Sequence, residues 1–350
     1  MKKLAALLVV AGSAVAGCGA PIGTSTNADK EAVSIHNCGE VKNLHKAKKL
    51  WAYDGSIIAT ALAAGAKDNL AYVSGIQRDR ATLEAKYGDL SGLNEVTPQA
   101  PSLEELVSKQ PELYFAGWGY GLGESSNVTP EALQNHGIES YVLSESCKQA
   151  GGARGTVDPW EAANTDIRNI AQLAGDPAAA ERTILDIDQR RQALVAAPHA
   201  DRRPNVFLFD SAKDAVFTSG KFGGPQAILD TAGARNATED IADTWTTVGW
   251  ETLAAENPDV IAFVDYPGQE FAEKVHILKT HPATKNLPAV KNDRFINLPY
   301  ALWTSGPLNI DAAEHVRAAL ENYHLVPATG HKPQLALPAD LAGREYLGRN

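Results

Sequence analysis

The chain has 350 residues, a formal net charge of −10, and hydrophobic side chains at 44% of its positions. This length suits about two domains. The acidic balance argues against a nucleic-acid partner and against electrostatic attraction to an anionic lipid surface. A membrane would therefore have to be reached through a covalent lipid rather than through charge.

The N-terminal segment 1–17 is typical of a lipoprotein signal peptide. Lys2 and Lys3 precede an apolar stretch that ends at residue 16 and is too short to span a bilayer. Residues 15–18, Val-Ala-Gly-Cys, resemble the bacterial lipobox, in which the cysteine thiol is acylated. An ordinary secretory signal that happens to contain a cysteine is the alternative. We expect Cys18 to carry a lipid that anchors the protein to the extracytoplasmic face of the cell membrane, and residues 18–30 to form a flexible tether.

Apolar strand-like runs then alternate with helix-like segments in two series. This alternation predicts two α/β lobes with mainly parallel sheets, an N-terminal lobe over residues 31–157 and a C-terminal lobe over residues 204–326. The expected strands are 50–53, 70–74, 113–117 and 141–143 in the first lobe, and 206–210, 215–218, 260–265 and 295–298 in the second.

A helical segment, residues 158–203, links the two series. Asp158-Pro159 has the signature of an N-cap followed by a first-turn proline, Gly175 ends that helix, and Asp176-Pro177 starts another. The second helix, residues 177–197, has one apolar stripe and would be about 31 Å long at 1.5 Å per residue. A helix of this length can cross from one lobe to the other.

One pattern occurs twice. Leu103-Glu104-x-Leu106 with Pro111-Glu112-Leu113 recurs as Trp250-Glu251-x-Leu253 with Pro258-Asp259-Val260. The glutamate and the proline are seven residues apart in both copies. Each copy predicts a helix that ends at a proline and leads into a strand, so the two lobes share one plan unless the match is due to chance.

Two cysteines remain after Cys18. In an oxidising exterior, Cys38 and Cys147 would most simply form one disulfide. Two unrelated buried thiols are the alternative. A metal site is disfavoured, because neither cysteine has a cysteine or histidine beside it at ligand spacing.

These segments resemble class III (helical-linker) periplasmic solute-binding proteins, the family that serves ABC importers of iron-siderophores, haem and cobalamin. The resemblance rests on the repeated pattern, on residues 217–221 (Phe-Thr-Ser-Gly-Lys) and on residues 232–236 (Ala-Gly-Ala-Arg-Asn), and it covers most of residues 38–325. It implies two Rossmann-like lobes joined by a single long helix, with a ligand cleft between the lobes. The Pro- and Gly-rich tail, residues 327–350, has no counterpart in that pattern.

The resemblance also implies a docking role for the repeated glutamates. In relatives, one exposed acid on each lobe contacts the two permease subunits, and the matching positions here are Glu104 and Glu251. Two charged groups on rigid lobes would set the register of a weak interface. The alternative is that each is a solvated first-turn glutamate favoured by the helix dipole. Glu105 leaves the register of the first acid open.

Ligands bind open α/β sheets outside the carboxyl ends of the strands, and large aromatic residues gather at those positions here. Two arginines just past the second strand could hold an anionic group. Ordinary packing is the alternative for each aromatic residue. The predicted ligand-binding residues are Tyr53, Arg78, Arg80, Trp118, Tyr120, Phe222, Trp245, Tyr266, Tyr300 and Trp303.

No pattern calls for catalysis. The nine histidines form no HxH or HExxH pair, and GxSxG and Walker motifs are absent. We expect a non-enzymatic protein, without a cofactor, that captures an iron-siderophore, haem or cobalamin-like solute for an ABC permease dimer. Two alternatives stay open: direct binding of zinc or manganese for an importer, and an enzyme built on the same lobes.

Overall fold

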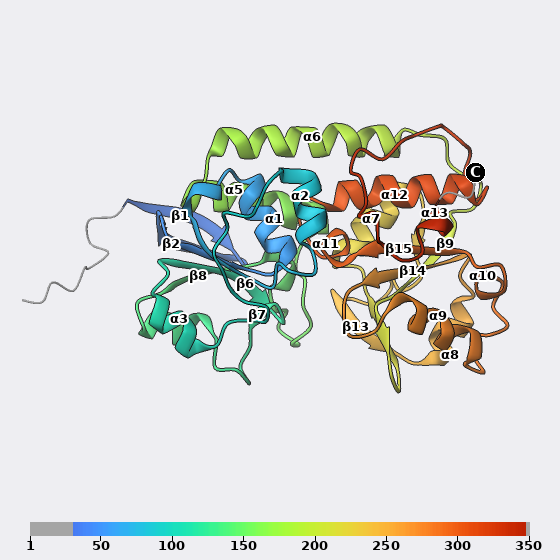
Figure 1. Cartoon of the computed structure of the whole chain (residues 1–350), viewed down its shortest axis with the longest axis horizontal. Coiled ribbons are helices and arrows are strands. Elements are labelled where there is room, and N and C mark those ends of the chain that lie inside the picture. The colour runs from blue at the N-terminus through green and yellow to red at the C-terminus, as the bar shows by residue number, and fades with distance from the viewer. Residues whose placement is uncertain (1–30, 348–350) are drawn as a thin grey trace, which may run out of the picture.

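Figure 1 shows the computed structural model of the chain, which describes residues 31–347. The predicted signal peptide, Cys18 and the tether lie outside these residues. Two α/β lobes lie side by side, and one long helix, α6 (Pro177–Val195), runs along both of them (Figure 1). Among the described residues, no helix is both long and apolar enough to cross a membrane.

The first lobe is built on a parallel sheet. The strands lie in the order β5-β4-β3-β6-β7, and β8 pairs with β6. The expected strands are present because each is an apolar run between helix signals. The strands are β3 (Leu50–Tyr53), β4 (Leu70–Ser74), β5 (Glu95–Thr97), β6 (Leu113–Trp118), β7 (Gly121–Leu122) and β8 (Glu139–Val142), and the helices include α1 (Gly55–Ala63), α2 (Arg80–Tyr87), α3 (Leu103–Lys109) and α4 (Pro130–Asn135).

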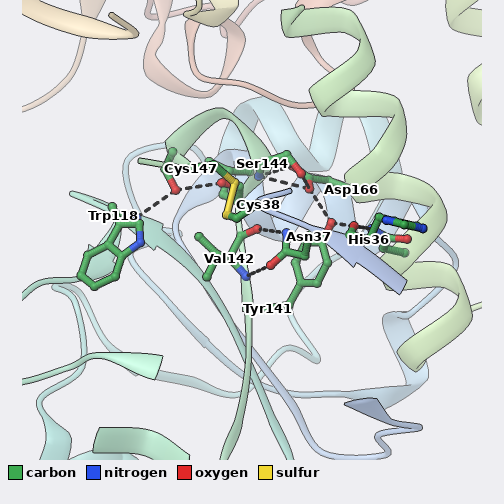
Figure 2. Close-up of a disulfide and its surroundings, with 12 residues drawn as sticks. His36, Asn37, Cys38, Trp118, Tyr141, Val142, Ser144, Cys147 and Asp166 are labelled. Carbon is green, nitrogen blue, oxygen red and sulfur yellow. Dashed lines mark hydrogen bonds between the residues drawn. A yellow bond between two sulfur atoms is a disulfide. The ribbon is translucent and has the colours of Figure 1, made fainter. Parts of the chain in front are cut away.

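An antiparallel hairpin that the sequence analysis did not predict precedes this sheet. It consists of β1 (Ala32–Asn37) and β2 (Glu40–His45). Cys38 and Gly39 form its two-residue turn, both with positive φ, as such turns require. A disulfide joins Cys38 to Cys147, the pair that the sequence favours, and Asn37 bonds the backbone of Val142 beside it (Figure 2). The hairpin is thereby fastened to the first lobe.

The linking segment follows its local signals. The Asp158 carboxylate accepts from the backbone N–H groups of Trp160 and Glu161 and begins α5 (Pro159–Ala174). Asp176 caps α6 in the same way. The predicted apolar stripe of α6 is buried against both lobes, which makes this helix a spine rather than a loose linker; the stripe is Ala180, Ile184, Ile187 and Leu194.

The second lobe combines a parallel sheet in the order β12-β9-β14-β15 with a small antiparallel sheet in the order β10-β11-β13. The predicted strand at 215–218 belongs to the antiparallel sheet. The strands are β9 (Asn205–Phe209), β10 (Ser211–Ala212), β11 (Val216–Ser219), β12 (Arg235–Asn236), β13 (Trp245–Val248), β14 (Val260–Asp265) and β15 (Phe295–Pro299). The helices are α7 (Gly224–Ala232), α8 (Trp250–Glu256), α9 (Phe271–Thr280), α10 (Pro288–Lys291), α11 (Tyr300–Trp303) and α12 (Asn309–Asn322).

The repeated pattern has the same structure in both lobes. In each copy a seven-residue helix, α3 or α8, ends at a left-handed residue and leads into a central parallel strand, β6 or β14. The left-handed residues are Gln110 and Asn257. The prediction of two α/β lobes on a shared plan is therefore confirmed.

Residues 327–347, expected as a tail, pack on the second lobe. Leu335 is buried in the main hydrophobic core, and the Asn297 side chain donates to the carbonyl oxygen of Ala342. The segment ends in a short helix, α13 (Arg344–Leu347).

Candidate functional site

A small cavity lies between the lobes. Its volume is about 130 Å³, and residues of both lobes line it. Several of them directly follow the carboxyl ends of parallel strands β6, β9 and β15, where open α/β sheets bind ligands. The lining residues are Gly119, Tyr120, Arg154, Asp210, Phe217, Trp245, Tyr300 and Thr304.

Arg78 joins one wall of this cavity to the first lobe. Its guanidinium lies 3.6 Å from the centroid of the Tyr300 ring and donates to Asp54 Oδ2 at 2.9 Å. The Tyr300 hydroxyl donates to the same oxygen at 3.0 Å. Asp79 accepts from Arg78 and from the backbone N–H of Ala301, and burial raises the pKa of Asp79 to about 6. The charge of Arg78 is thus already matched by two carboxylates.

Asp210 also lines the cavity. Its Oδ1 accepts from the Tyr266 hydroxyl at 2.6 Å, and the Tyr266 ring packs edge-on against Tyr300. Burial raises the pKa of Asp210, while the nearby cations Arg78 and Lys274 act in the opposite direction. The carboxylate is therefore partly compensated by its surroundings.

Arg154 spans the gap between the lobes. Its guanidinium donates to the carbonyl oxygen of Trp118 in the first lobe at 3.0 Å and to that of Trp245 in the second lobe at 3.1 Å. Its backbone N–H donates to Asp243 Oδ1. Gly119 has a φ of +81°, and a Cβ at that position would lie 2.7 Å from Nη1 of Arg154. Glycine at position 119 therefore allows both the turn and the close approach of the arginine.

Glu145 is buried where the lobes meet. Its Oε1 accepts from the backbone N–H of Gly224 at the start of α7, so a carboxylate of the first lobe contacts a helix of the second. Burial raises the pKa of Glu145 to about 7, against the opposing effects of Arg154, Gly224 and Trp245. Glu145 therefore keeps its proton to a higher pH than an exposed glutamate does.

A wider, open groove of about 560 Å³ adjoins the cavity and shares Gly119 and Arg154 with it. Trp118 lines this groove, and Lys148 Nζ lies 3.6 Å from the centroid of its indole ring and 2.8 Å from Glu124 Oε1. The remaining wall is rich in glycine and serine, so backbone is accessible there; it comprises Ala100, Gly121, Leu122, Gly123, Ser125, Ser126 and Gly152.

The structure brings most of the predicted ligand-binding residues to this region. Tyr120, Trp245 and Tyr300 line the cavity and Trp118 lines the groove. Arg78 and Tyr266 support the cavity wall from behind. Tyr53 packs under Gly121, and Phe222 lies against Gly155 without lining the cavity.

Two predicted residues lie elsewhere. Arg80 donates to Glu95 and to the Leu90 carbonyl, because the first turn of α2 directs it toward those acceptors rather than into the cleft. Trp303 is fully buried, and its Nε1 donates to the Phe263 carbonyl, so it is a core residue.

Sequence reasoning missed five lining residues of the cavity, namely Gly119, Arg154, Asp210, Phe217 and Thr304. Asp210 follows β9 directly, so the strand-end rule applied to charged as well as aromatic residues would have found it. Arg154 has no such signal, because it lies in an irregular loop placed by tertiary contacts.

Glu104 and Glu251 are exposed in the first turns of α3 and α8. These helices lie one on each lobe, on the side of the molecule away from α6 (Figure 1). Glu105 accepts from the backbone N–H of Ser102 in a capping box, whereas Glu104 has no hydrogen bond or ion pair within residues 31–347. Of the two neighbouring acids, Glu104 is therefore the one available to a partner.

Among residues 31–347, no group of three or more histidine, cysteine, aspartate or glutamate side chains is arranged to hold a metal ion.

Comparison with known proteins adds to this geometry. Residues 51–302 match the family model described as periplasmic binding protein. No curated protein matches the chain significantly in sequence.

Three solved structures illustrate the fold similarity. A periplasmic binding protein from Veillonella parvula superposes with a TM-score of 0.69 at 20% identity, covering 85% of this chain and 99% of that one. An ABC-type Fe³⁺-hydroxamate transport protein from Saccharomonospora viridis superposes with a TM-score of 0.65 at 21% identity, covering 81% of this chain and 97% of that one. A periplasmic heme-binding protein from Pseudomonas aeruginosa superposes with a TM-score of 0.58 at 19% identity, covering 84% of this chain and 95% of that one. At these identities the likeness concerns the fold alone.

Proposed function

Because this chain belongs to the periplasmic binding protein family, we propose that it is the lipid-anchored, extracytoplasmic substrate-binding protein of an ABC importer. In this proposal it captures an iron-siderophore, haem or a similar chelate and delivers it to the permease.

One observation carries the proposal for capture. Residues of both lobes line the cavity, and four of its eight lining residues are aromatic, whereas the adjoining groove lies on the first lobe and has Trp118 as its aromatic residue. Aromatic residues in a preformed cleft supply contact area at little conformational cost, with a few polar groups to orient the ligand. Solutes with a bulky body and polar arms suit this arrangement. The Fe³⁺-hydroxamate and heme proteins that share the fold are consistent with this ligand class.

Delivery would depend on Glu104 and Glu251. Both are exposed, they occupy equivalent positions on the two lobes, and both lie on the side away from the spine helix α6 (Figure 1). Paired charges on a rigid frame would dock on cations of the two permease subunits and set the orientation of the complex. The lobes are held together by α6, so the spacing of the two acids would change little on binding.

Mass spectrometry and metal analysis of protein purified under native conditions would test the proposal. We expect an organic iron chelate or haem to be retained and to be displaced by added ferric tris-hydroxamate or haem in a fluorescence titration. Stoichiometric zinc or manganese with no organic ligand would contradict the proposal and favour direct metal-ion binding.

A further inference from the structure

The cavity holds two formal charges, and they differ in how well the protein compensates them. Of the eight lining residues, only Arg154 and Asp210 are charged. Asp210 receives the Tyr266 hydroxyl and feels the attraction of two cations, Arg78 and Lys274. Its negative charge is therefore already opposed from two directions.

Arg154 has no comparable partner. Its guanidinium donates only to the carbonyl oxygens of Trp118 and Trp245, and within residues 31–347 it forms no ion pair with a carboxylate. The other cations around the site differ, since Arg78 pairs with Asp54 and Lys148 pairs with Glu124.

Glu145 interacts electrostatically with Arg154, but its carboxyl group compensates the charge of the guanidinium poorly. Glu145 is buried, and burial raises its pKa to about 7, so its proton is held more firmly than that of an exposed glutamate. A guanidinium that is partly removed from water and lacks an anion is stabilised by any anionic group that can reach it.

The loop that carries Arg154 is held on both sides. At its start, Cys147 is tied by the disulfide to the hairpin of the first lobe. Farther on, the Gln149 side chain donates to the Ala242 carbonyl and the Arg154 backbone to Asp243, both in the second lobe. The guanidinium is thus positioned before a ligand arrives, which lowers the entropic cost of binding.

We propose that Arg154 binds an anionic group of the ligand, a carboxylate, phenolate or oxyanion, inside the cavity while the body of the ligand lies in the groove beside Trp118. The sizes agree, because the cavity has a volume of only about 130 Å³. Only a small group fits there, whereas the groove of about 560 Å³ accepts a bulkier body. A planar body would stack on the indole of Trp118 in place of Lys148.

This inference rests on the proposed function and narrows its ligand class. It favours chelates that carry negative charge, such as ferric tris-catecholates, or haem with its two carboxylates, over electrically neutral ferric tris-hydroxamates.

The test compares three probes, namely a ferric tris-catecholate, haem and a neutral ferric tris-hydroxamate, on four proteins. These are the wild type, Arg154→Gln, Arg154→Lys, and Arg168→Gln as a matched control in which an exposed arginine paired with Glu181 is lost. We expect the wild type to prefer the anionic probes. Arg154→Gln should weaken those about 10- to 100-fold, because a charge-assisted bidentate contact is lost, and should change the neutral probe by less than about threefold. Arg154→Lys keeps the positive charge but lacks the planar guanidinium, so its affinity for the anionic probes should lie between those of the wild type and Arg154→Gln. Arg168→Gln should bind all three probes as the wild type does.

Asp210→Asn tests the opposite change in charge, because it removes a negative group from the cavity instead of a positive one. Removing this carboxylate should strengthen the binding of the anionic probes, because it takes a negative charge out of the cavity. The proposal is overturned if Arg154→Gln weakens all three probes equally or none of them, or if only Asp210→Asn weakens binding, which would indicate a cationic group. Thermal unfolding of each variant separates loss of binding from loss of fold, and Arg154→Lys keeps the test available if Arg154→Gln does not fold.

Molybdate and phosphate distinguish failure of this inference from failure of the proposed function. If no chelate binds but the wild type binds one of these oxyanions and Arg154→Gln does not, the chelate function is wrong and the anion site stands. If neither chelates nor oxyanions bind, the anion site is wrong as well.

Discussion

Lys86 of the first lobe and Asp311 of the second are joined by a hydrogen bond, with Lys86 Nζ donating to Asp311 Oδ1 at 3.1 Å. Arg190 of the spine helix α6 donates to the same oxygen at 2.6 Å and also contacts Glu314. Asp311 is fully buried, so one carboxylate connects both lobes and the helix between them. This cluster sets the relative position of the two halves of the site.

We expect Asp311→Ala to destabilise the protein by about 3 kcal/mol, the lower end for breaking a buried pair, since it leaves Lys86 without its anion while Arg190 keeps Glu314. Chemical denaturation would measure the loss. Glu181→Gln is the control, because it removes an exposed pair with Arg168, and exposed pairs contribute about 1 kcal/mol or less. Equal stabilities of Asp311→Ala and the control would show that the cluster does not hold the lobes.

The buried acid Glu145 makes stability depend on pH. Its pKa is about 7 in the folded protein, against about 4.3 when unfolded. Between these values the folded state keeps a proton that the unfolded state has lost, so the free energy of unfolding falls as pH rises from about 4.5 to 7 and then levels off. Asp79 and Asp166 act in the same sense, with folded pKa values of about 6 and 7.

Glu145→Gln should remove the share of this slope that belongs to Glu145. We expect the difference in unfolding free energy between pH 5 and pH 8 to shrink by about 2 to 3 kcal/mol relative to the wild type. Urea unfolding at the two pH values measures it. An unchanged pH dependence would mean that the folded carboxyl group ionises near its ordinary pKa.

The Cys38–Cys147 disulfide closes a long loop, with a sequence separation of 109 residues. The chain-entropy estimate for such a loop is about 4 to 5 kcal/mol, before any strain is discounted. We expect Cys38→Ser, Cys147→Ser to unfold at lower denaturant concentration. Thiol counting under denaturing conditions gives the direct check, and two free thiols in protein taken from its native compartment would refute the pairing.

Anchoring at Cys18 remains a prediction from the lipobox-like run. Cys18→Ala should release the protein from the membrane fraction or leave it mis-sorted, because the acidic mature chain has no charge attraction to anionic lipid. Fractionation with labelled palmitate decides the matter. A variant that stays in the membrane and still incorporates the label would contradict the assignment.

The helices and strands were predictable where their signals are local. Asp158-Pro159, Gly175 and Asp176-Pro177 delimit α5 and α6 through capping groups only a few residues away. The hairpin of β1 and β2 was missed because its strands are short, polar and partly exposed, and its turn contains Cys38 rather than a usual turn residue.

The cleft was partly predictable, because the carboxyl ends of parallel strands lie at one edge of the sheet whatever the conformation of the loops that follow them. That rule led to Trp118, Tyr120 and Tyr300. It failed for Trp303, since α11 turns that side chain into the core. Arg154 could not be predicted from the sequence, because its position depends on a loop held by contacts with both lobes.

The last prediction separates capture from delivery. If Glu104 and Glu251 dock the permease, the double variant Glu104→Ala, Glu251→Ala should lose uptake in cells but keep ligand affinity in a fluorescence titration. Both side chains are exposed, so the variant should fold like the wild type. Glu161→Ala with Glu345→Ala is a suitable control, because it removes two other exposed first-turn acids, in α5 and α13.

Trp118→Ala should weaken ligand binding, in contrast to the double glutamate variant, which should lose uptake and keep ligand affinity. It removes a groove aromatic without touching the docking acids, so affinity should fall by about 1 to 3 kcal/mol, or about 5- to 150-fold. Trp303→Ala would not serve here, because deleting a fully buried indole damages the fold itself. Normal uptake by the double glutamate variant at wild-type abundance would exclude the docking role of Glu104 and Glu251, and it would leave ligand capture in the cleft unaffected, because the two groups of residues lie on different parts of the molecule.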